Sequence, residues 1–97
     1  MDKFLFSLFL SEIDDQFMQL IPQHRERVNE LLIREIIETY AVSADRTKAW
    51  VVVNAATEEE AIAVIESFII RDYFSYDLDQ LFIYDNALGL MPKMALN

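Results

Sequence analysis

The 97-residue chain has no cysteine, one glycine, two prolines and one histidine, and each scarcity excludes a class of function. Without cysteine, disulfides and thiolate chemistry are ruled out. A metal site would have to use mostly carboxylates, and Asp77 and Asp79, which share one strand face, have no obvious third partner. The lone glycine leaves no glycine-rich loop for a phosphate, and no G-x-S-x-G nucleophile elbow occurs. We therefore expect neither a metal nor another cofactor.

Basic residues are also few, with 8 Lys and Arg against 17 Asp and Glu and a formal net charge of −9. Such a surface repels nucleic acid and anionic lipid, so neither is an expected partner. The apolar run 4–10 is far shorter than the roughly 20 residues of a membrane helix. A signal peptide has a basic segment before its apolar run, which Asp2 interrupts here, and acidic residues directly follow the run. We expect a cytoplasmic protein.

Apolar side chains, in contrast, are abundant: they make up 54% of the chain. A chain of this length buries roughly 60 to 68% of its unfolded surface, so residues 1–97 can form one domain with one core. A single small core has few places for so much apolar surface. Part of it is therefore expected to be buried against another subunit.

The clearest local signal is a strand followed by a capped helix. The β-branched run 50–53 leads through Asn54 to the sequence Thr57-Glu58-Glu59-Glu60. The Thr57 hydroxyl can accept from the N–H of Glu60, while the Glu60 side chain reaches back to the N–H of Thr57. An apolar stripe then recurs at helical spacing at Ala61, Ile62, Ile65, Phe68 and Ile69. This stripe predicts a helix that lies on a sheet.

The remaining patterns predict four strands and two helices. The strands are expected at residues 3–11, 36–43, 49–55 and 77–84, with an aromatic-rich loop at 71–76. A helical pattern covers 17–32 and contains Pro22, which costs about 3 kcal/mol in a helix interior. We therefore expect a short helical turn before Pro22 and the main helix starting near Ile21.

The resulting order, βαββαβ, predicts an α+β, ferredoxin-like fold. Its antiparallel sheet has the first and third strands at the centre and both helices on one face. The other face would expose an apolar set drawn from Leu5, Phe9, Val51, Val53, Leu81 and Ile83, or from their alternates. Packing of this face against a second copy would bury it, which predicts a homodimer. The apolar tail, 85–97, is expected to dock, with a frayed terminus as the alternative.

Five segments carry a resemblance to a known family: KFLFSLFL (3–10), FMQLIPQHRERVNELL (17–32), 38–53, EEEAIAVIESF (58–68) and 73–84. The most specific part is the P-x-H-x-x-x-V pattern at 22–28. The chain resembles the muconolactone isomerase-like and YciI-like proteins of the dimeric α+β barrel kind. The resemblance implies paired sheets, in some relatives further assembly into larger oligomers, and a ligand pocket between sheet and helices. Relatives usually have a glycine where this chain has Ile33-Arg34-Glu35, and a proline near Ile69-Ile70-Arg71.

The candidate site residues centre on His24, which falls on the apolar stripe between Ile21 and Val28. An imidazole with a pKa near 6.5 suits proton abstraction and return. With His24 we place Tyr40 as a catalytic candidate. The candidates for substrate binding are Ser43, Arg46 and Tyr73, and a ligand carboxylate could be held by either Arg25 or Arg46.

Structural roles remain the alternatives for each of these residues. His24 could be an inert, hydrogen-bonded residue at the edge of the core. Arg25 fits a solvated helix face rich in opposite charges, and Tyr40 fits cross-strand packing.

Three functions are compatible with these features. The first is a cofactor-free isomerase or lyase that acts on a small organic acid or lactone, with His24 as proton carrier. The second is a non-catalytic module for small-ligand binding or oligomeric assembly, which predicts that His24 is fully buried or fully exposed and that no polar groups converge with it on a cavity. The third is a cofactor-free monooxygenase, which the residue types of Trp50 and Asn54 suggest, although the two form no recognisable motif with His24.

Overall fold

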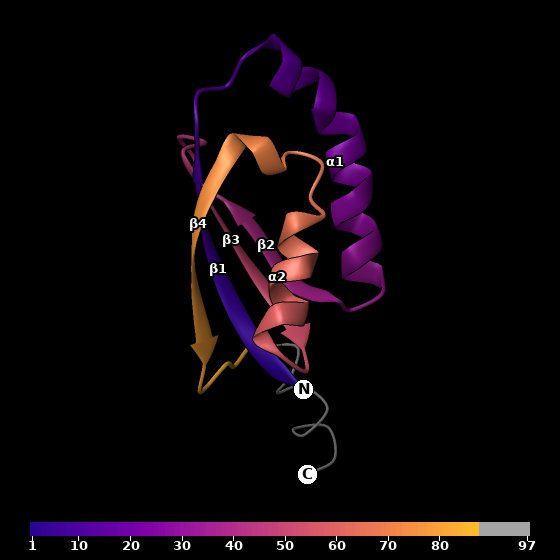
Figure 1. The fold of residues 1–97 in the computed structure, drawn as a ribbon, viewed down its shortest axis with the longest axis vertical. Coiled ribbons are helices and arrows are strands. Elements are labelled where there is room, and N and C mark those ends of the chain that lie inside the picture. The colour runs from indigo at the N-terminus through magenta and orange to yellow at the C-terminus, as the bar shows by residue number, and fades with distance from the viewer. Residues whose placement is uncertain (88–97) are drawn as a thin grey trace.

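The computed structural model describes residues 1–87, so most of the tail that is predicted to dock, 85–97, lies outside the described residues. The elements are β1 (Asp2–Leu10), α1 (Asp15–Ile33), β2 (Ile37–Val42), β3 (Lys48–Ala55), α2 (Glu58–Glu66), the 3₁₀ turn η1 (Arg71–Tyr73) and β4 (Phe74–Leu81). All neighbouring strands are antiparallel, in the order β2-β3-β1-β4. Both helices lie on one face of the sheet (Figure 1). The predicted α+β, ferredoxin-like βαββαβ fold is confirmed, with β1 and β3 at the centre.

The core lies between the sheet and the two helices. Phe4, Phe6 and Leu8 of β1 point toward the helices, and each is at most 2% exposed. The helices contribute buried residues to the same cluster, among them Val28 and Leu31 from α1 and Ala61 and Ile65 from α2. Burying a large apolar side chain stabilises by roughly 1.5 to 3 kcal/mol, so this cluster holds the helices on the sheet. None of the helices within residues 1–87 has the length and apolarity needed to cross a membrane.

The opposite face of the sheet follows from the strand register. Val51 and Val53 pair with Phe6 and Phe4 and are fully buried on the helix side. The outward-facing positions are occupied by the residues of β3 that alternate with Val51 and Val53, and by Leu5, Phe9 and Leu81. On this face Phe9 is 39% and Trp50 37% exposed. The outward surface is therefore apolar around Leu5, Phe9 and Trp50, whereas Lys3, Ser7 and Asn54 are polar positions on the same face.

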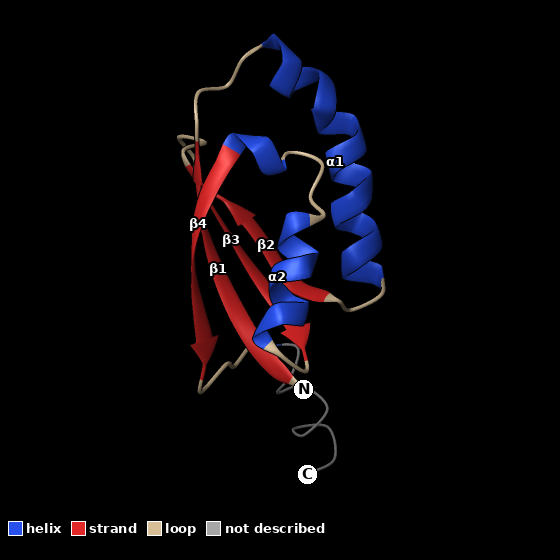
Figure 2. Cartoon of the chain, viewed as in Figure 1, coloured by secondary structure: helices blue, strands red, loops and turns tan. Residues whose placement is uncertain are grey.

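The predicted break before Pro22 is wrong, because α1 is one helix of 19 residues with Pro22 inside it. Its start is set earlier, where the Asp14 carboxylate accepts from the N–H of Phe17 at 2.8 Å. Phe17 is 6% exposed, so the first turns bury apolar surface that offsets the cost of the proline. The first turns of α1 run at an angle to the rest of the helix (Figure 2). Proline in a helix interior causes such a bend.

The start of α2 agrees with the predicted capping box in its main contact. The N–H of Glu60 donates to the Thr57 hydroxyl at 3.2 Å. The Glu60 carboxylate, however, accepts from the N–H of Ala56 at 3.1 Å, one residue earlier than expected. The side chain therefore also holds the chain that leads from β3 into the helix.

The fourth strand begins three residues before the predicted start, at Phe74, and ends at Leu81. Its limits follow those of β1, because Leu10 pairs with Phe74 and Lys3 pairs with Leu81. Phe74 is 6% exposed, whereas Phe82, just past the strand, is 98% exposed. Part of the predicted 71–76 loop is therefore core strand, and β4 stops where its partner strand runs out.

The glycine expected from relatives is replaced by a residue with the backbone conformation that glycine favours. Glu35, which follows α1, has φ 59°. Its N–H donates to the carbonyl of Leu32, and that of Ile36 donates to Leu31, which closes the helix end. The turn is thus preserved without the glycine.

Candidate functional site

A cavity of about 340 Å³ lies between the first half of α1 and the end of the sheet where β1 and β2 finish. Its walls are mostly apolar, and α1 contributes Phe17, Met18 and Ile21. Its polar lining residues are His24 and Arg25 from α1, Tyr40 from β2 and Arg46 from the β2–β3 turn. A small apolar cavity with a few converging polar groups has the make-up of a ligand site.

The polar centre of this cavity is a pair formed by His24 and Tyr40. His24 Nε2 lies 2.7 Å from the Tyr40 hydroxyl oxygen. His24 is 2% exposed, whereas Tyr40 is half-buried, so Tyr40 is the more accessible member. The ring of Phe68 packs edge-on to His24 at a centroid distance of 5.6 Å. The second ring nitrogen, Nδ1, is buried without a hydrogen-bond partner among residues 1–87.

This environment determines the protonation of both groups. Burial, and after it the positive charge of Arg25, lowers the pKa of His24 to about 4. Burial raises the pKa of the Tyr40 hydroxyl, and Arg25 opposes that shift. At neutral pH the pair is therefore a neutral imidazole beside a protonated phenol. Such a pair can accept a proton and return it.

Two guanidinium groups line the same cavity. The Arg25 guanidinium carbon lies 5.7 Å from the ring centroid of Tyr40, within the range of a cation–π contact. Arg46 belongs to the β2–β3 turn and has φ 64°. No carboxylate is among the described residues that line the cavity. The cavity is therefore electropositive in a chain whose net charge is −9.

Ser43 has a different place, in the hydrogen-bond network of the β2–β3 turn. Its hydroxyl donates to Asp45 Oδ1 at 2.7 Å and accepts from the N–H of Lys48 at 3.0 Å. The hydroxyl and N–H of Thr47 donate to the same Asp45 oxygen. These hydrogen bonds, led by that from Ser43, lower the pKa of Asp45 to about 2. Ser43 thus holds the turn that carries Arg46 and lies outside the described cavity lining.

Tyr73 lies behind the cavity wall. It ends η1 and packs edge-on against Phe17 at a centroid distance of 5.1 Å. Desolvation, followed by the charge of Asp14, raises the pKa of the Tyr73 hydroxyl. Of the five residues singled out from the sequence, the structure brings His24, Tyr40 and Arg46 together and places Ser43 and Tyr73 beside the site.

Arg25 joins the cavity although its position also fits a solvated helix face. Because Arg25 directly follows His24 in the sequence, its place at the same end of the site could have been inferred from that of His24. Trp50 and Asn54, by contrast, belong to the outward-facing set of β3, since they alternate with the buried Val51 and Val53. The features that pointed toward a monooxygenase are therefore on the opposite face of the sheet from His24.

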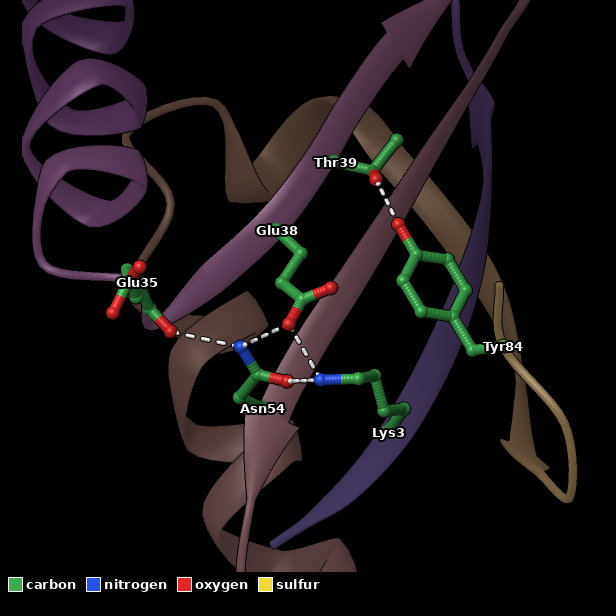
Figure 3. Close-up of polar contacts among 6 residues, drawn as sticks. All are labelled: Lys3, Glu35, Glu38, Thr39, Asn54 and Tyr84. Atoms are coloured by element: carbon green, nitrogen blue, oxygen red, sulfur yellow. Dashed lines mark hydrogen bonds and ion pairs between the residues drawn. The ribbon is translucent and has the colours of Figure 1, made fainter. Parts of the chain in front are cut away.

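A second hollow, of about 560 Å³, lies at the other end of β2 and is lined by Glu35, Glu38, Thr39 and Tyr84 among others. Polar groups converge beside it (Figure 3). Lys3 Nζ donates to Glu38 Oε1 at 2.5 Å and to Asn54 Oδ1 at 2.6 Å.

The other polar groups of this network are also hydrogen-bonded to one another. Asn54 Nδ2 donates to the carbonyl of Glu35 at 2.9 Å, and the Thr39 and Tyr84 hydroxyls lie 2.7 Å apart. The network therefore fastens the positive-φ turn after α1 and the segment after β4 to the sheet. Within residues 1–87, no cluster of three or more potential metal-ligating side chains occurs.

No protein-family model matches the chain, and no curated protein sequence matches it. Among solved structures, it is similar to 5-chloro-2-hydroxyhydroquinone dehydrochlorinase (TftG) from Burkholderia phenoliruptrix AC1100, in complex with 2,5-dihydroxybenzoquinone. The TM-score is 0.54 at 11% identity, over 88% of this chain and 97% of that chain. The similarity is one of fold. It supports the fold that the resemblance to muconolactone isomerase-like proteins implies, and it singles out no member of that group.

Proposed function

We propose that the protein is a cofactor-free enzyme of the isomerase or lyase type that acts on a small organic acid or lactone. The observation that carries the proposal is the 2.7 Å contact between His24 and Tyr40 at the wall of a cavity. The other lining residues of this cavity are apolar, apart from two arginines. The similar fold of a dehydrochlorinase is consistent with a small-molecule enzyme.

The proposed step is a proton transfer through Tyr40. As the Tyr40 oxygen takes a proton from the ligand, its own proton passes to Nε2 of His24, and the electron pair of the broken bond stays on the ligand. Return of the proton to another ligand atom completes an isomerisation. In an elimination that electron pair forms the new double bond, the leaving group departs with the pair of its own bond, and the proton held by the Tyr40–His24 pair passes to the leaving group. Arg46 holds a carboxylate of the ligand. The step uses the His24 tautomer whose hydrogen is on Nδ1.

The test begins with a thermal-shift screen of lactones, dicarboxylates and phenolic acids. A ligand at about 100 times its dissociation constant stabilises by about 2.7 kcal/mol, and each kcal/mol shifts the melting temperature by about 4 to 8 °C. Ligands that bind are then assayed for turnover with Tyr40→Phe, which removes only the hydroxyl. Loss of a general acid–base group lowers the rate by about 10² to 10⁴-fold.

The matched control is Tyr76→Phe, which removes the hydroxyl of another half-buried tyrosine in the same sheet. It is expected to keep full turnover. Unchanged turnover in Tyr40→Phe, with the fold verified by circular dichroism, would overturn the proposed mechanism.

A non-catalytic ligand-binding module is the second candidate, and the 2% exposure of His24 favours it. The convergence of Tyr40, Arg25 and Arg46 on the same cavity as His24 favours the enzyme. The two functions separate in one experiment, because the module binds a ligand without converting it.

We also propose a homodimer in which the outward face of the sheet packs against its counterpart. Phe9 and Trp50 support it, since both expose more than a third of their surface on that face. Large exposed apolar groups on one face mark an interaction surface.

A further inference from the structure

The charge of the 340 Å³ cavity is unusual for this chain. The protein has 17 acidic and 8 basic residues, yet two arginines and no acidic residue are among the described residues that line the cavity. A random sample of this surface would be acidic. The lining therefore favours an anionic ligand.

The chain has five arginines, and the two in the cavity differ from the others in their partners. Arg27 and Arg34 lie within 3.5 Å of Glu30, and Arg71 lies 2.8 Å from Glu66. Within residues 1–87, Arg25 and Arg46 belong to no ion pair; the Arg25 guanidinium faces the Tyr40 ring. Their guanidinium groups are thus available to an external carboxylate.

The backbone of Arg46 gives a second, independent indication. Its φ of 64° is in the left-handed region, where a non-glycine residue costs about 1 to 2 kcal/mol. Glycine or asparagine would suit this turn better. The hydrogen bonds around Asp45 hold the turn in spite of that cost. The turn thus places a long cation at the cavity at a conformational cost, which supports a binding role for Arg46.

We propose that Arg25 and Arg46 form a two-point anion site and that the ligand of this cavity is a small acid with two acidic groups. The two arginines come from different elements, α1 and the β2–β3 turn, so each can hold one end of the ligand. Guanidinium binds a carboxylate through paired hydrogen bonds. This inference rests on the proposed function in taking the cavity as the ligand site, and it specifies the class of ligand.

Binding at Arg25 also has a spectroscopic consequence. The charge of Arg25 contributes to the low pKa of His24. A carboxylate on that guanidinium cancels part of the charge, so bound ligand raises the pKa of His24. Because His24 is the only histidine, its imidazole resonance reports this change directly.

The experiment measures binding by isothermal titration calorimetry with matched pairs of probes. Succinate is compared with butyrate, adipate with hexanoate, and phthalate with benzoate. At least one diacid is expected to bind at least 10-fold more tightly than its monoacid partner, since it adds a charged hydrogen-bonded contact. The His24 resonance in that complex should titrate at a higher pH than in the free protein.

Four variants, one of them a control, test the two arginines. Arg25→Gln and Arg46→Gln should each weaken diacid binding at least 10-fold, whereas Arg34→Gln, which removes the same charge from the exposed end of α1, should not. Arg46→Gly gives the turn its preferred residue, so it should keep or raise the melting temperature while losing affinity. Equal binding of diacids and monoacids, absence of binding by all six probes, or unchanged affinity in Arg25→Gln would each overturn the two-point site.

The outcome is separable from that of the proposed function. Tyr40-dependent turnover of an uncharged lactone, without binding of any diacid, would overturn this inference and leave the enzyme proposal standing. Arginine-dependent diacid binding with turnover unaffected by Tyr40→Phe would do the reverse.

Discussion

Among single residues, His24 differs most from a free side chain, because its pKa is about 4 in the folded protein against about 6.5 in an unfolded chain. As the pH falls below 6.5, the unfolded chain takes up this proton first. The folded state is therefore destabilised between pH 6.5 and 4, by an amount on the order of 3 kcal/mol, and the loss levels off below pH 4. Urea unfolding across this range measures the effect.

His24→Gln is the reference for this measurement, because glutamine does not titrate and can still bond to the Tyr40 hydroxyl. Carboxylates titrate equally in both proteins, so the difference between the two curves isolates His24. The imidazole resonance of the wild type should have its midpoint near pH 4. A midpoint near 6.5 would contradict the burial of the ring.

The sequence identified His24 from its chemistry and its place on the apolar stripe of the first predicted helix, and Tyr40 from its chemistry on the second predicted strand. It did not predict the low pKa, which depends on burial against residues distant in sequence such as Phe68. Arg46 was also found from its chemistry. Its left-handed backbone was not foreseen, since the hydrogen bonds of the turn impose it. Residue type thus indicated the participants, and tertiary contacts set their properties.

Among the elements, local sequence signals predicted that a helix or a strand forms better than they predicted the residues at which it begins and ends. The capping residues located the start of α2 because the contact spans three residues. The limits of β4 were displaced because an apolar alternation runs on past Leu81, whereas the ladder ends with its partner strand β1. The continuity of α1 through Pro22 was missed for a similar reason, since burial of Phe17 is a long-range effect.

The helix α1 yields a prediction on Pro22. Pro22→Ala restores a backbone donor and removes a steric clash, which in a helix interior are together worth about 3 kcal/mol. The unfolded chain gains about 0.4 to 1 kcal/mol of entropy from the loss of proline, which opposes the gain. Part of the remainder is already relieved by the bend (Figure 2). We expect a net stabilisation of about 1 to 2 kcal/mol by urea unfolding.

Gln23→Ala is the control, because it changes the next residue of the helix without affecting the backbone. It should leave the free energy of unfolding within about 0.5 kcal/mol of wild type, as surface substitutions do. Destabilisation by Pro22→Ala would mean that the bend is needed to seat Phe17 and Ile21 over the cavity.

At the scale of the whole molecule, the proposed sheet-to-sheet dimer leads to a test that uses the only tryptophan. Trp50 lies on the outward face and is 37% exposed in the single chain. Association should bury the indole, so its emission should shift to shorter wavelength as the protein concentration rises. Sedimentation velocity over the same concentrations should show the mass increase from one chain to two.

Phe9→Asp places a carboxylate on the outward face of the sheet. In a symmetric dimer the carboxylates of both subunits would be buried in the interface and lose their hydration. It should yield monomers with red-shifted emission at concentrations where the wild type is dimeric. Ile33→Asp adds the same charge at an 82% exposed apolar position on α1 and should leave the dimer intact. A wild type that stays monomeric at every concentration, or a Phe9→Asp variant that still dimerises, would contradict the proposed interface. In either case the 39% exposure of Phe9 would need another partner.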